Sequence, residues 1–411
     1  MTHRVLLALF AVVLSLPTHA QIRLRLQPPA QPEAPKLAST PLEAFVRVLR
    51  KGDLLLARTL LAADRGLLVA ADAQGMRVLH AAVSGASDLA AVQLLLAEGA
   101  EVNAGDKGGS TALHYAASHD LAEISTALLD RGAAIDAVNA EGDTPLTSAL
   151  RRRGREVAGL LIDRGADINR AGAQGLTPLA SAVREGDLKL AARLLERGAD
   201  ANHGGAHNMQ VPAVLAFASR RGIAEALPLL QLLAANRGDL RRTFDDQGRG
   251  LLQIALLGAG SETDRQARAA GLTGLGLDAN ARDIRGRTAL HIAARFGDAG
   301  TVAALLRGGA NPDVVDSEYA TALLEAVESG KLEAVRALLD AHANPNVKGD
   351  PRDMKHTPLT LAAWRGRLDM VELLLTGGAD QGLVAARRTP LEWAQRGNRR
   401  EVVLRLGGPP P

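Results

Sequence analysis

The sequence predicts an all-α fold, a solenoid of stacked helix pairs, on two main observations. Closely similar segments begin at Thr111, Thr144 and Thr177, so the pattern returns every 33 residues, a period typical of repeat arrays. Hydrophobic residues make up 47% of the chain but aromatic residues only 2%, so Leu, Ala and Val must form the core, which suits short, closely packed helices. At 411 residues the chain is also too long for one conventional core.

The repeat that begins at Thr111 shows how each element is predicted. A short helix follows Thr111, and apolar residues with helical spacing predict a second helix over residues 122–130. Gly132 provides the left-handed residue that ends the second helix. A loop rich in Asp, Asn and Gly then leads to the next repeat, where Pro145 suits the first position of a helix. Neither helix is long enough to be stable alone, so each pair must stack on its neighbours.

Two motifs recur in register along the chain. Eight segments open with Thr-Pro-Leu-His-x-Ala or a close variant, and five contain the turn Gly-Ala-Asp-x-Asn or a variant. The openings start at Arg77, Thr111, Thr144, Thr177, Thr288, Thr321, Thr357 and Thr389, and the turns at Gly99, Gly165, Gly198, Gly309 and Gly377. In these motifs the chain resembles the ankyrin-repeat family over nearly all of residues 40–405. The resemblance implies an ankyrin-repeat solenoid of about 10–11 helix-turn-helix units with protruding, β-hairpin-like loops, and a short tail at residues 406–411.

Two places depart from the period. Repeats near 211–287 are irregular, because the spacings from Val211 to Gly250 and from Gly250 to Thr288 are 39 and 38 residues. We expect longer, atypical helices in this segment and a weak joint in the array. The loop before Thr357 is also lengthened, and insertions in a solenoid fall on its exposed rim.

The first 39 residues are expected to lie outside the solenoid. Residues 1–20 have a basic start, an apolar stretch from Val5 to Leu16 and small residues before Gln21. This is the layout of a cleaved signal peptide with its cut after Ala20, and the apolar stretch is too short to span a membrane. Residues 21–39 are rich in Pro and Gln and predict an extended tether. From the signal peptide and the Arg- and Ala-rich composition we expect an exported bacterial protein, periplasmic or secreted. Because the chain has no Cys, it can form no disulfides.

The histidines indicate structure more than chemistry. His80, His114 and His291 occupy the fourth position of their repeats, where the family resemblance implies a hydrogen bond that joins neighbouring repeats. His203 and His207 lie four residues apart in a Gly-rich loop, and they are the one candidate for a metal site, with a metal-dependent hydrolase as the corresponding function. No third ligand is near them, and no metalloprotease, serine-hydrolase or phosphate-binding motif occurs. We therefore expect neither catalysis nor a cofactor nor a metal.

The candidate binding residues lie on the first helix of each repeat, at positions that ankyrin repeats point into a concave groove. Counting the opening residue as one, positions five, eight and nine hold several arginines and four of the nine aromatic residues. Arg together with aromatic side chains is typical of protein interfaces. The alternative is a solvated arginine face, but such faces mix in Lys and Glu, which are scarce at these positions. The candidate residues are Tyr115, His119, Arg151, Arg152, Arg184, Arg295, Phe296, Trp364, Arg365, Trp393 and Arg396.

This pattern predicts a non-enzymatic scaffold in the cell envelope that holds a partner protein with an acidic or amphipathic surface. The arginines are spread singly along the array, so nucleic acid is not the expected partner. We expect a monomer. A purely structural spacer without a selective partner is the remaining alternative.

Overall fold

A computed structural model of the chain describes residues 40–203, 212–216, 222–347, 356–385 and 387–409. The predicted signal peptide (1–20) and tether (21–39) lie outside the described residues, and so does His207 of the candidate metal loop. Within the described part, the regular elements are helices, and the loops contain three isolated β-bridges but no strand. Among these helices none has the length and apolar character needed to cross a membrane.

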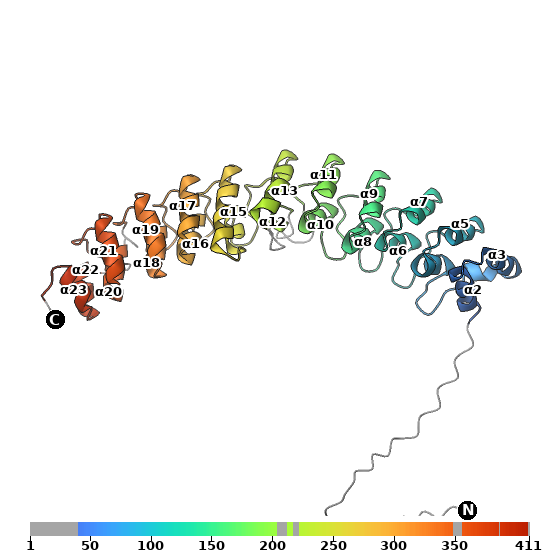
Figure 1. The fold of residues 1–411 in the computed structure, drawn as a ribbon, viewed down its shortest axis with the longest axis horizontal. Coiled ribbons are helices and arrows are strands. Elements are labelled where there is room, and N and C mark those ends of the chain that lie inside the picture. Colours follow the sequence, from blue (N-terminus) through green and yellow to red (C-terminus); the bar gives the residue numbers. More distant parts are fainter. Residues whose placement is uncertain (1–39, 204–211, 217–221, 348–355, 386, 410–411) are drawn as a thin grey trace, which may run out of the picture.

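The helices form a curved row of pairs (Figure 1). One helix of each pair lies on the concave side of the arc and is called the inner helix, and the other lies on the convex side. The inner helices are α2 (Pro41–Arg50), α4 (Val78–Ala81), α6 (Ala112–Ser118), α8 (Pro145–Arg152), α10 (Pro178–Glu185), α12 (Pro212–Leu215), α14 (Leu251–Leu257), α16 (Ala289–Phe296), α18 (Ala322–Glu328), α20 (Pro358–Arg365) and α22 (Pro390–Arg396).

The outer helices cover the convex side (Figure 1). They are α3 (Leu54–Ala63), α5 (Leu89–Ala97), α7 (Ala122–Asp130), α9 (Arg155–Asp163), α11 (Leu188–Glu196), α13 (Ile223–Ala235), α15 (Glu262–Gly274), α17 (Ala299–Arg307), α19 (Leu332–Asp340), α21 (Leu368–Thr376) and α23 (Arg400–Arg405). A 3-10 turn, η1 (Arg65–Leu68), follows α3, and a π-helical turn, η2 (Ala82–Ala86), extends α4. The solenoid predicted from the sequence is thereby confirmed, and α7 coincides with the helix expected over residues 122–130.

Stacking buries the apolar faces that no single pair could hide. Leu113 and Leu128 of one repeat and Leu146 and Leu161 of the next are each 0% exposed. The core cluster continues in this way from α2 to α23. Full burial of a Leu side chain stabilises a fold by roughly 1.5–3 kcal/mol, so the many small contacts between neighbouring repeats add up to the stability that the isolated pairs lack.

The fourth-position histidines join neighbouring repeats, as the resemblance implies. The backbone N–H of Thr111 donates to Nδ1 of His114, and Nε2 of His114 donates to the carbonyl of Asp143 in the next repeat, both over 3.1 Å. His80 and His291 make the equivalent contacts with the carbonyls of Ser110 and Ala320, again at 3.1 Å. All three rings are buried, and burial lowers their pKa values. The hydrogen bonds require a neutral ring that carries its proton on Nε2, because Nδ1 is an acceptor.

A second set of contacts joins the loops. The side-chain oxygen of an Asn or Asp in one loop accepts the backbone N–H of the equivalent loop in the next repeat, as from Ala134 to Asn103 over 2.7 Å. We call this set the loop ladder. In the described residues its accepting side chains are Asn103, Asp136, Asn169, Asn202, Asn280, Asp313 and Asn346.

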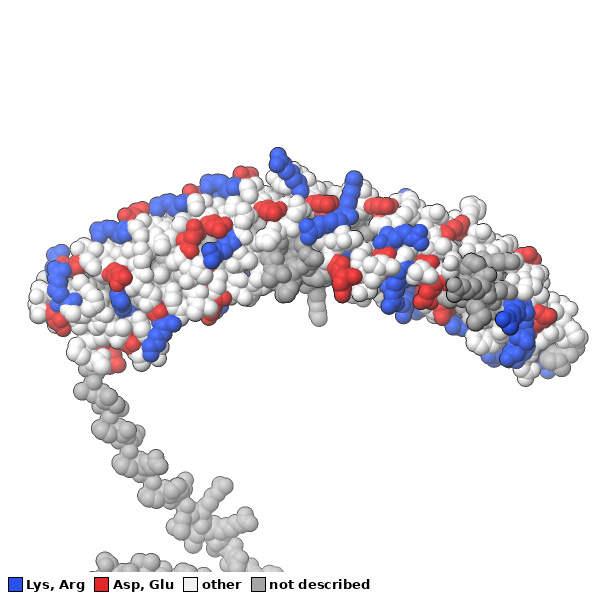
Figure 2. Space-filling model, turned by 180° about the vertical axis from the view of Figure 1, so that it is seen from behind, with Lys and Arg blue, Asp and Glu red and all other residues white. Residues whose placement is uncertain are grey.

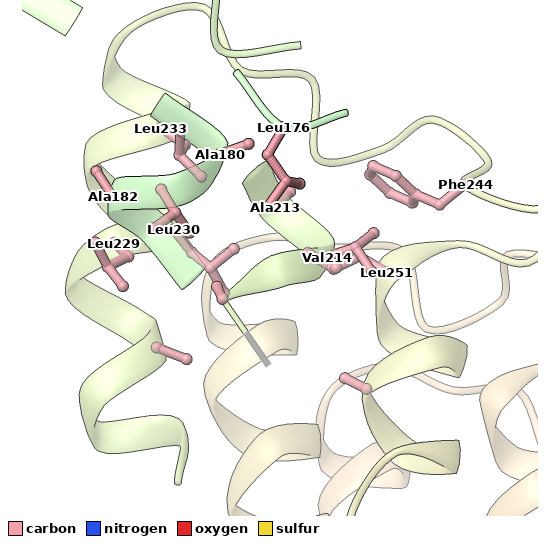
Figure 3. Close-up of a cluster of buried hydrophobic side chains, with 14 of the residues drawn as sticks. Leu176, Ala180, Ala182, Ala213, Val214, Leu229, Leu230, Leu233, Phe244 and Leu251 are labelled. Carbon is pink, nitrogen blue, oxygen red and sulfur yellow. The ribbon is translucent and has the colours of Figure 1, made fainter. Parts of the chain in front are cut away.

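The irregular segment keeps the architecture with altered helix lengths. Its inner helix α12 has four residues, whereas α13 and α15 have 13 residues each instead of the nine of α11 and α17. The longer helices match the expectation from the sequence. Figure 3 shows the core around α12, where Ala213 and Val214 lie between the Leu side chains of α13 on one side and the buried residues Phe244 and Leu251 on the other.

Candidate functional site

The concave side of the arc carries clefts between the inner helices and the loops. One cleft of about 410 Å³ is lined by residues of the repeats that begin at Thr111 and Thr144, among them Tyr115, His119 and Arg151. A second, of about 490 Å³, lies nearer the C-terminal end and is lined by residues that include Arg295, Glu325 and His356. Of the sequence-predicted candidates, Tyr115, His119, Arg151 and Arg152 line the first cleft, here called the N-terminal cleft, and Arg295 lines the second, the C-terminal cleft.

In the N-terminal cleft, Tyr115 is held by its own repeat. Its hydroxyl donates to Oδ2 of Asp106 over 2.6 Å. Partial burial, together with the hydrogen bond and the negative charge of the Asp106 carboxylate, raises the pKa of Tyr115 to about 12. His119 ends α6, and its Nδ1 lies 2.8 Å from the carbonyl of Tyr115. Both side chains thus line the cleft while serving local structure.

Arg151 is also internally paired. Its Nη2 lies 2.9 Å from Oδ2 of Asp143 and 3.1 Å from Oε2 of Glu141, both in the loop that precedes α8. Asp143 is 2% exposed, and its Oδ1 accepts the backbone N–H of Ala173 and the hydroxyl of Thr147. Arg152, one residue further on, is exposed and has no ion pair with any other described residue.

Two further groove arginines have partners as well. Nη1 of Arg184 donates to Oε1 of Gln174 over 2.9 Å, and its Nε lies 3.8 Å from Glu185. Arg365 donates to the carbonyl of Glu328 and lies 4.0 Å from its carboxylate. Acceptors on neighbouring loops and helices therefore offset part of the positive charge of the groove arginines. The positive potential is lower than the sequence alone suggests.

The C-terminal cleft mixes both signs of charge. Arg285, Arg287 and Arg295 line it together with Asp316, Glu318, Glu325 and Glu328. Glu325 is half-buried, and burial raises the pKa of its carboxyl, with a further increase from Glu328 and an opposing effect from Arg295. Arg295 has no ion pair within 4.0 Å in the described residues, although it faces this cleft.

Phe296 lies apart from these residues. The guanidinium carbon of Arg265 in α15 is 4.8 Å from the centre of its ring, and Arg265 is itself paired with Asp298. Phe296 is 40% exposed, but it does not line the cleft that contains Arg295. It belongs to a cation–π contact at the turn between α16 and α17.

At the C-terminal end of the groove three rings meet in what we call the aromatic cluster. The His356 ring stacks on Trp364 with centres 5.5 Å apart and 9° between planes, and Trp393 meets His356 edge-on at 4.6 Å and Trp364 at 6.0 Å. Nε1 of Trp393 donates to the carbonyl of Ala385 over 3.1 Å, which fixes its orientation. Burial lowers the pKa of His356, and Arg365 lowers it further, so the ring is neutral at pH 7.

Arginines surround the aromatic cluster. The guanidinium carbon of Arg388 is 5.4 Å from the centre of the Trp393 ring. Arg396 follows Trp393 by three residues on α22 and is exposed. Neither Arg388 nor Arg396 has a carboxylate partner among the described residues, in contrast to Arg151.

The sequence did not point to His356, to Arg388 or to the loop carboxylates. His356 and Arg388 each precede the opening Thr of a repeat, so they fall outside the motif positions that predict the groove. Glu141 lies ten residues before Arg151, a separation to which helical periodicity assigns no contact. A comparison of the residues immediately before each opening Thr could have identified three of these side chains. This position holds Asp143 in one repeat and His356 and Arg388 in two others.

The described residues contain no group of three or more His, Asp or Glu side chains that could hold a metal ion. His203 is exposed at the start of the loop, and His207 lies outside the described residues. The structure therefore adds no observation in favour of a metal site here.

Figure 2 shows the surface from the side opposite to Figure 1. Basic and acidic side chains lie interspersed on this face, without an extended strip of either sign. A continuous basic track, which a nucleic-acid backbone requires, is absent from the described residues visible there.

Family models for ankyrin repeats match most of the chain. The family model described as ankyrin repeats in three copies matches residues 45–139, 79–172, 127–205 and 269–349, and the model of a single ankyrin repeat matches residues 354–385. Among solved structures, the chain is similar to the crystal structure of a human ASB11 ankyrin repeat domain, with 24% identity, a TM-score of 0.46, and coverage of 57% of this chain and 98% of that one. A search of curated proteins found no match.

The matched segments together cover more than half of the 411 residues. Ankyrin repeats are protein-protein interaction modules and are generally non-enzymatic. The chain belongs to the ankyrin-repeat family.

Proposed function

We propose that the protein is an exported scaffold that holds a partner protein in its concave groove. The observation that carries the proposal is the placement of Arg and aromatic side chains along the inner helices, beside clefts of about 410 and 490 Å³. Side chains of these types anchor protein interfaces because they combine apolar area with hydrogen bonds. Trp364 and Phe296, both about 40% exposed, are large apolar groups that a partner would cover.

The groove is not uniformly basic, and this refines the expected partner. Arg151, Arg184 and Arg365 already have acceptors, so their main contribution is shape and hydrogen bonding. Arg152, Arg295 and Arg396 have no ion pair in the described residues, and these are the charges that a partner's carboxylates would meet. We therefore expect an amphipathic partner surface with a few acidic groups in place of a strongly acidic one.

The test is a charge reversal with a matched control. The groove variant carries Arg152→Glu, Arg295→Glu and Arg396→Glu, and the control carries Lys189→Glu, Arg307→Glu and Arg400→Glu on the outer helices. Because none of the six side chains holds an ion pair in the described residues, both variants should keep the helical circular-dichroism spectrum. In affinity capture from the native envelope fraction, the control should retain the proteins that the wild type retains, and the groove variant should lose them.

An unchanged set of captured proteins with the groove variant would favour the spacer alternative. The location has a separate test, which is N-terminal sequencing of the protein recovered from the periplasm or medium. Cleavage of the predicted signal peptide gives a mature chain that begins at Gln21. An intact N-terminus starting at Met1 in the cytoplasm would contradict export and leave groove binding untouched.

A further inference from the structure

The aromatic cluster differs from the rest of the groove in being prepared for a ligand. His356, Trp364 and Trp393 support one another at ring distances of 4.6 to 6.0 Å, so little side-chain freedom remains to be lost on binding. Trp364 is nevertheless 42% exposed. A large, fixed and exposed aromatic surface is the usual composition of an interface anchor.

The charges around the cluster are unequal. Arg388 lies against the Trp393 ring, Arg396 is on the same helix face as Trp393, and neither has a carboxylate partner in the described residues. Nε of Arg399 donates to the carbonyl of Trp364 over 3.1 Å. The nearby carboxylates are occupied, since Glu392 accepts the backbone N–H of Thr389 as a helix cap, and Glu328 lies 4.0 Å from Arg365. As far as the described residues show, the C-terminal edge of the cluster therefore has positive charge without a carboxylate partner.

We propose that the aromatic cluster anchors an acidic, amphipathic peptide segment of the partner, with an apolar side chain on Trp364 and carboxylates on Arg388 and Arg396. This inference rests on the proposed function of the groove as a protein-binding surface. A basic segment would meet Arg365, Arg388 and Arg396 without enough carboxylates to offset its charge. An apolar segment without acidic groups would leave the two unpaired guanidinium groups without partners on a covered surface.

Nucleic acid is the competing ligand class, because bases stack on Trp and phosphates bind Arg. The C-terminal cleft, which His356 also lines, holds four acidic side chains, Asp316, Glu318, Glu325 and Glu328, beside three arginines. A polyanion that continued from the cluster into this cleft would therefore meet carboxylates that outnumber the arginines. A short acidic segment of a protein would contact the aromatic cluster without entering the C-terminal cleft. The charge distribution therefore favours an acidic segment over a nucleic acid.

The chain offers a direct measurement, because it has two Trp residues and both belong to the cluster. Intrinsic Trp emission of the full protein therefore reports on this site alone. The probes are a Trp-free peptide of alternating Glu and Leu, the matching peptide of Lys and Leu, and a single-stranded oligonucleotide. We expect a saturable change in emission with the Glu–Leu peptide and none with the other two.

Variants assign the change to the cluster. The double variant Arg388→Gln, Arg396→Gln should bind the Glu–Leu peptide about tenfold or more weakly, because two charge-assisted hydrogen bonds are lost. Arg307→Gln on the outer helix α17 is the control and should bind like the wild type. No change in emission with the Glu–Leu peptide, an equal or stronger response to the Lys–Leu peptide or to the oligonucleotide, or full binding by the double variant would each overturn the inference.

These outcomes are separable from failure of the proposed function. If the Arg152, Arg295 and Arg396 charge reversal abolishes partner capture while the peptides leave Trp emission unchanged, the groove binds its partner without the acidic anchor. If the Glu–Leu peptide binds and the charge reversal leaves capture unchanged, the cluster binds acidic peptides but the groove is not the main interface.

Discussion

The N-terminal cleft and the aromatic cluster use the same positions of the repeat and yet have opposite properties. In the N-terminal cleft, Tyr115 and Arg151 are bound to the carboxylates of Asp106 and Asp143. At the other end of the groove, Trp364 and Trp393 occupy equivalent positions, and among the described residues their rings contact other rings, an arginine and a backbone carbonyl, without a carboxylate partner. The repeat position thus decides where a side chain points, and the preceding loop decides whether it is available to a partner.

The decisive difference is one residue before each opening Thr. Asp143 stands there in the N-terminal cleft and pairs with Arg151, whereas His356 and Arg388 stand there at the C-terminal end and contact the Trp rings. We therefore regard the N-terminal cleft mainly as structure and the aromatic cluster mainly as a binding surface. Four measurements test this division.

The largest effect is expected from Asp143→Ala. This change removes the acceptor for the Ala173 N–H and the Thr147 hydroxyl and leaves Arg151 without its buried partner. We expect a loss of about 2–3 kcal/mol in the free energy of unfolding, measured by urea denaturation. Glu141→Ala is the matched control, since this carboxylate is 62% exposed, and it should change stability by no more than about 0.5 kcal/mol. Equal effects of the two changes would contradict the structural role assigned to Asp143.

Trp364→Ala should show the reverse profile. Because the side chain is 42% exposed, we expect the stability to fall by about 1 kcal/mol. Binding of the acidic Glu–Leu peptide should weaken by about 2 kcal/mol, as for an interface anchor. Calorimetry of peptide binding and urea denaturation separate the two quantities. A variant that loses stability but binds the peptide normally would assign Trp364 to the fold.

Acid should weaken the whole array through its buried histidines. Burial lowers the pKa values of His80, His114 and His291 below the ordinary histidine value of 6.5. Since the unfolded chain takes up protons first as pH falls, the neutral rings contribute their full stability above about pH 6.5, and this contribution is lost as pH falls through the lower folded-state values.

Denaturation midpoints measured above and below pH 6.5 test this effect, and His114→Gln should reduce the pH dependence. A chain that is more stable in mild acid would show that other groups dominate. His356 should report separately, because its protonation next to Trp364 quenches Trp emission at a pH below 6.5.

The smallest effect is expected from Tyr115→Phe. The change removes one hydrogen bond to Asp106 at a partly buried site, which costs about 0.5–1.5 kcal/mol. Capture of the partner and binding of the Glu–Leu peptide should be unchanged. If the binding free energy fell by more than the free energy of unfolding, Tyr115 would be a binding residue. The division between a structural N-terminal cleft and a binding aromatic cluster would then be wrong.

The fold could be predicted almost entirely from the sequence, because each repeat carries its own start, turn and apolar faces. The helix pairs and the longer helices α13 and α15 follow from local patterns. The role of His80, His114 and His291 follows from the family resemblance. The short helix α12 and the buried Phe244 did not, since they depend on how two imperfect repeats fill a common core.

The site could be predicted only in part. Period and register placed Trp364, Trp393 and the arginines on the inner helices, but not their partners. Whether Arg151 is paired depends on a loop residue eight positions earlier, and whether Phe296 faces a cleft depends on Arg265 of the preceding repeat. Such contacts between separate loops and helices do not follow the repeat period, so periodicity in the sequence cannot predict them.

The loop ladder has a consequence for how such a molecule changes its size over generations. Each accepting Asn or Asp reaches only to the adjacent loop, as Asn103 reaches Ala134 and Asn346 reaches Asp380. A duplicated repeat would therefore bring the loop-ladder contacts that join it to both neighbours. It would also add a new set of inner-helix positions that face the groove. The arc can lengthen or shorten by whole units, and its reach over a partner can change without redesign of any existing contact.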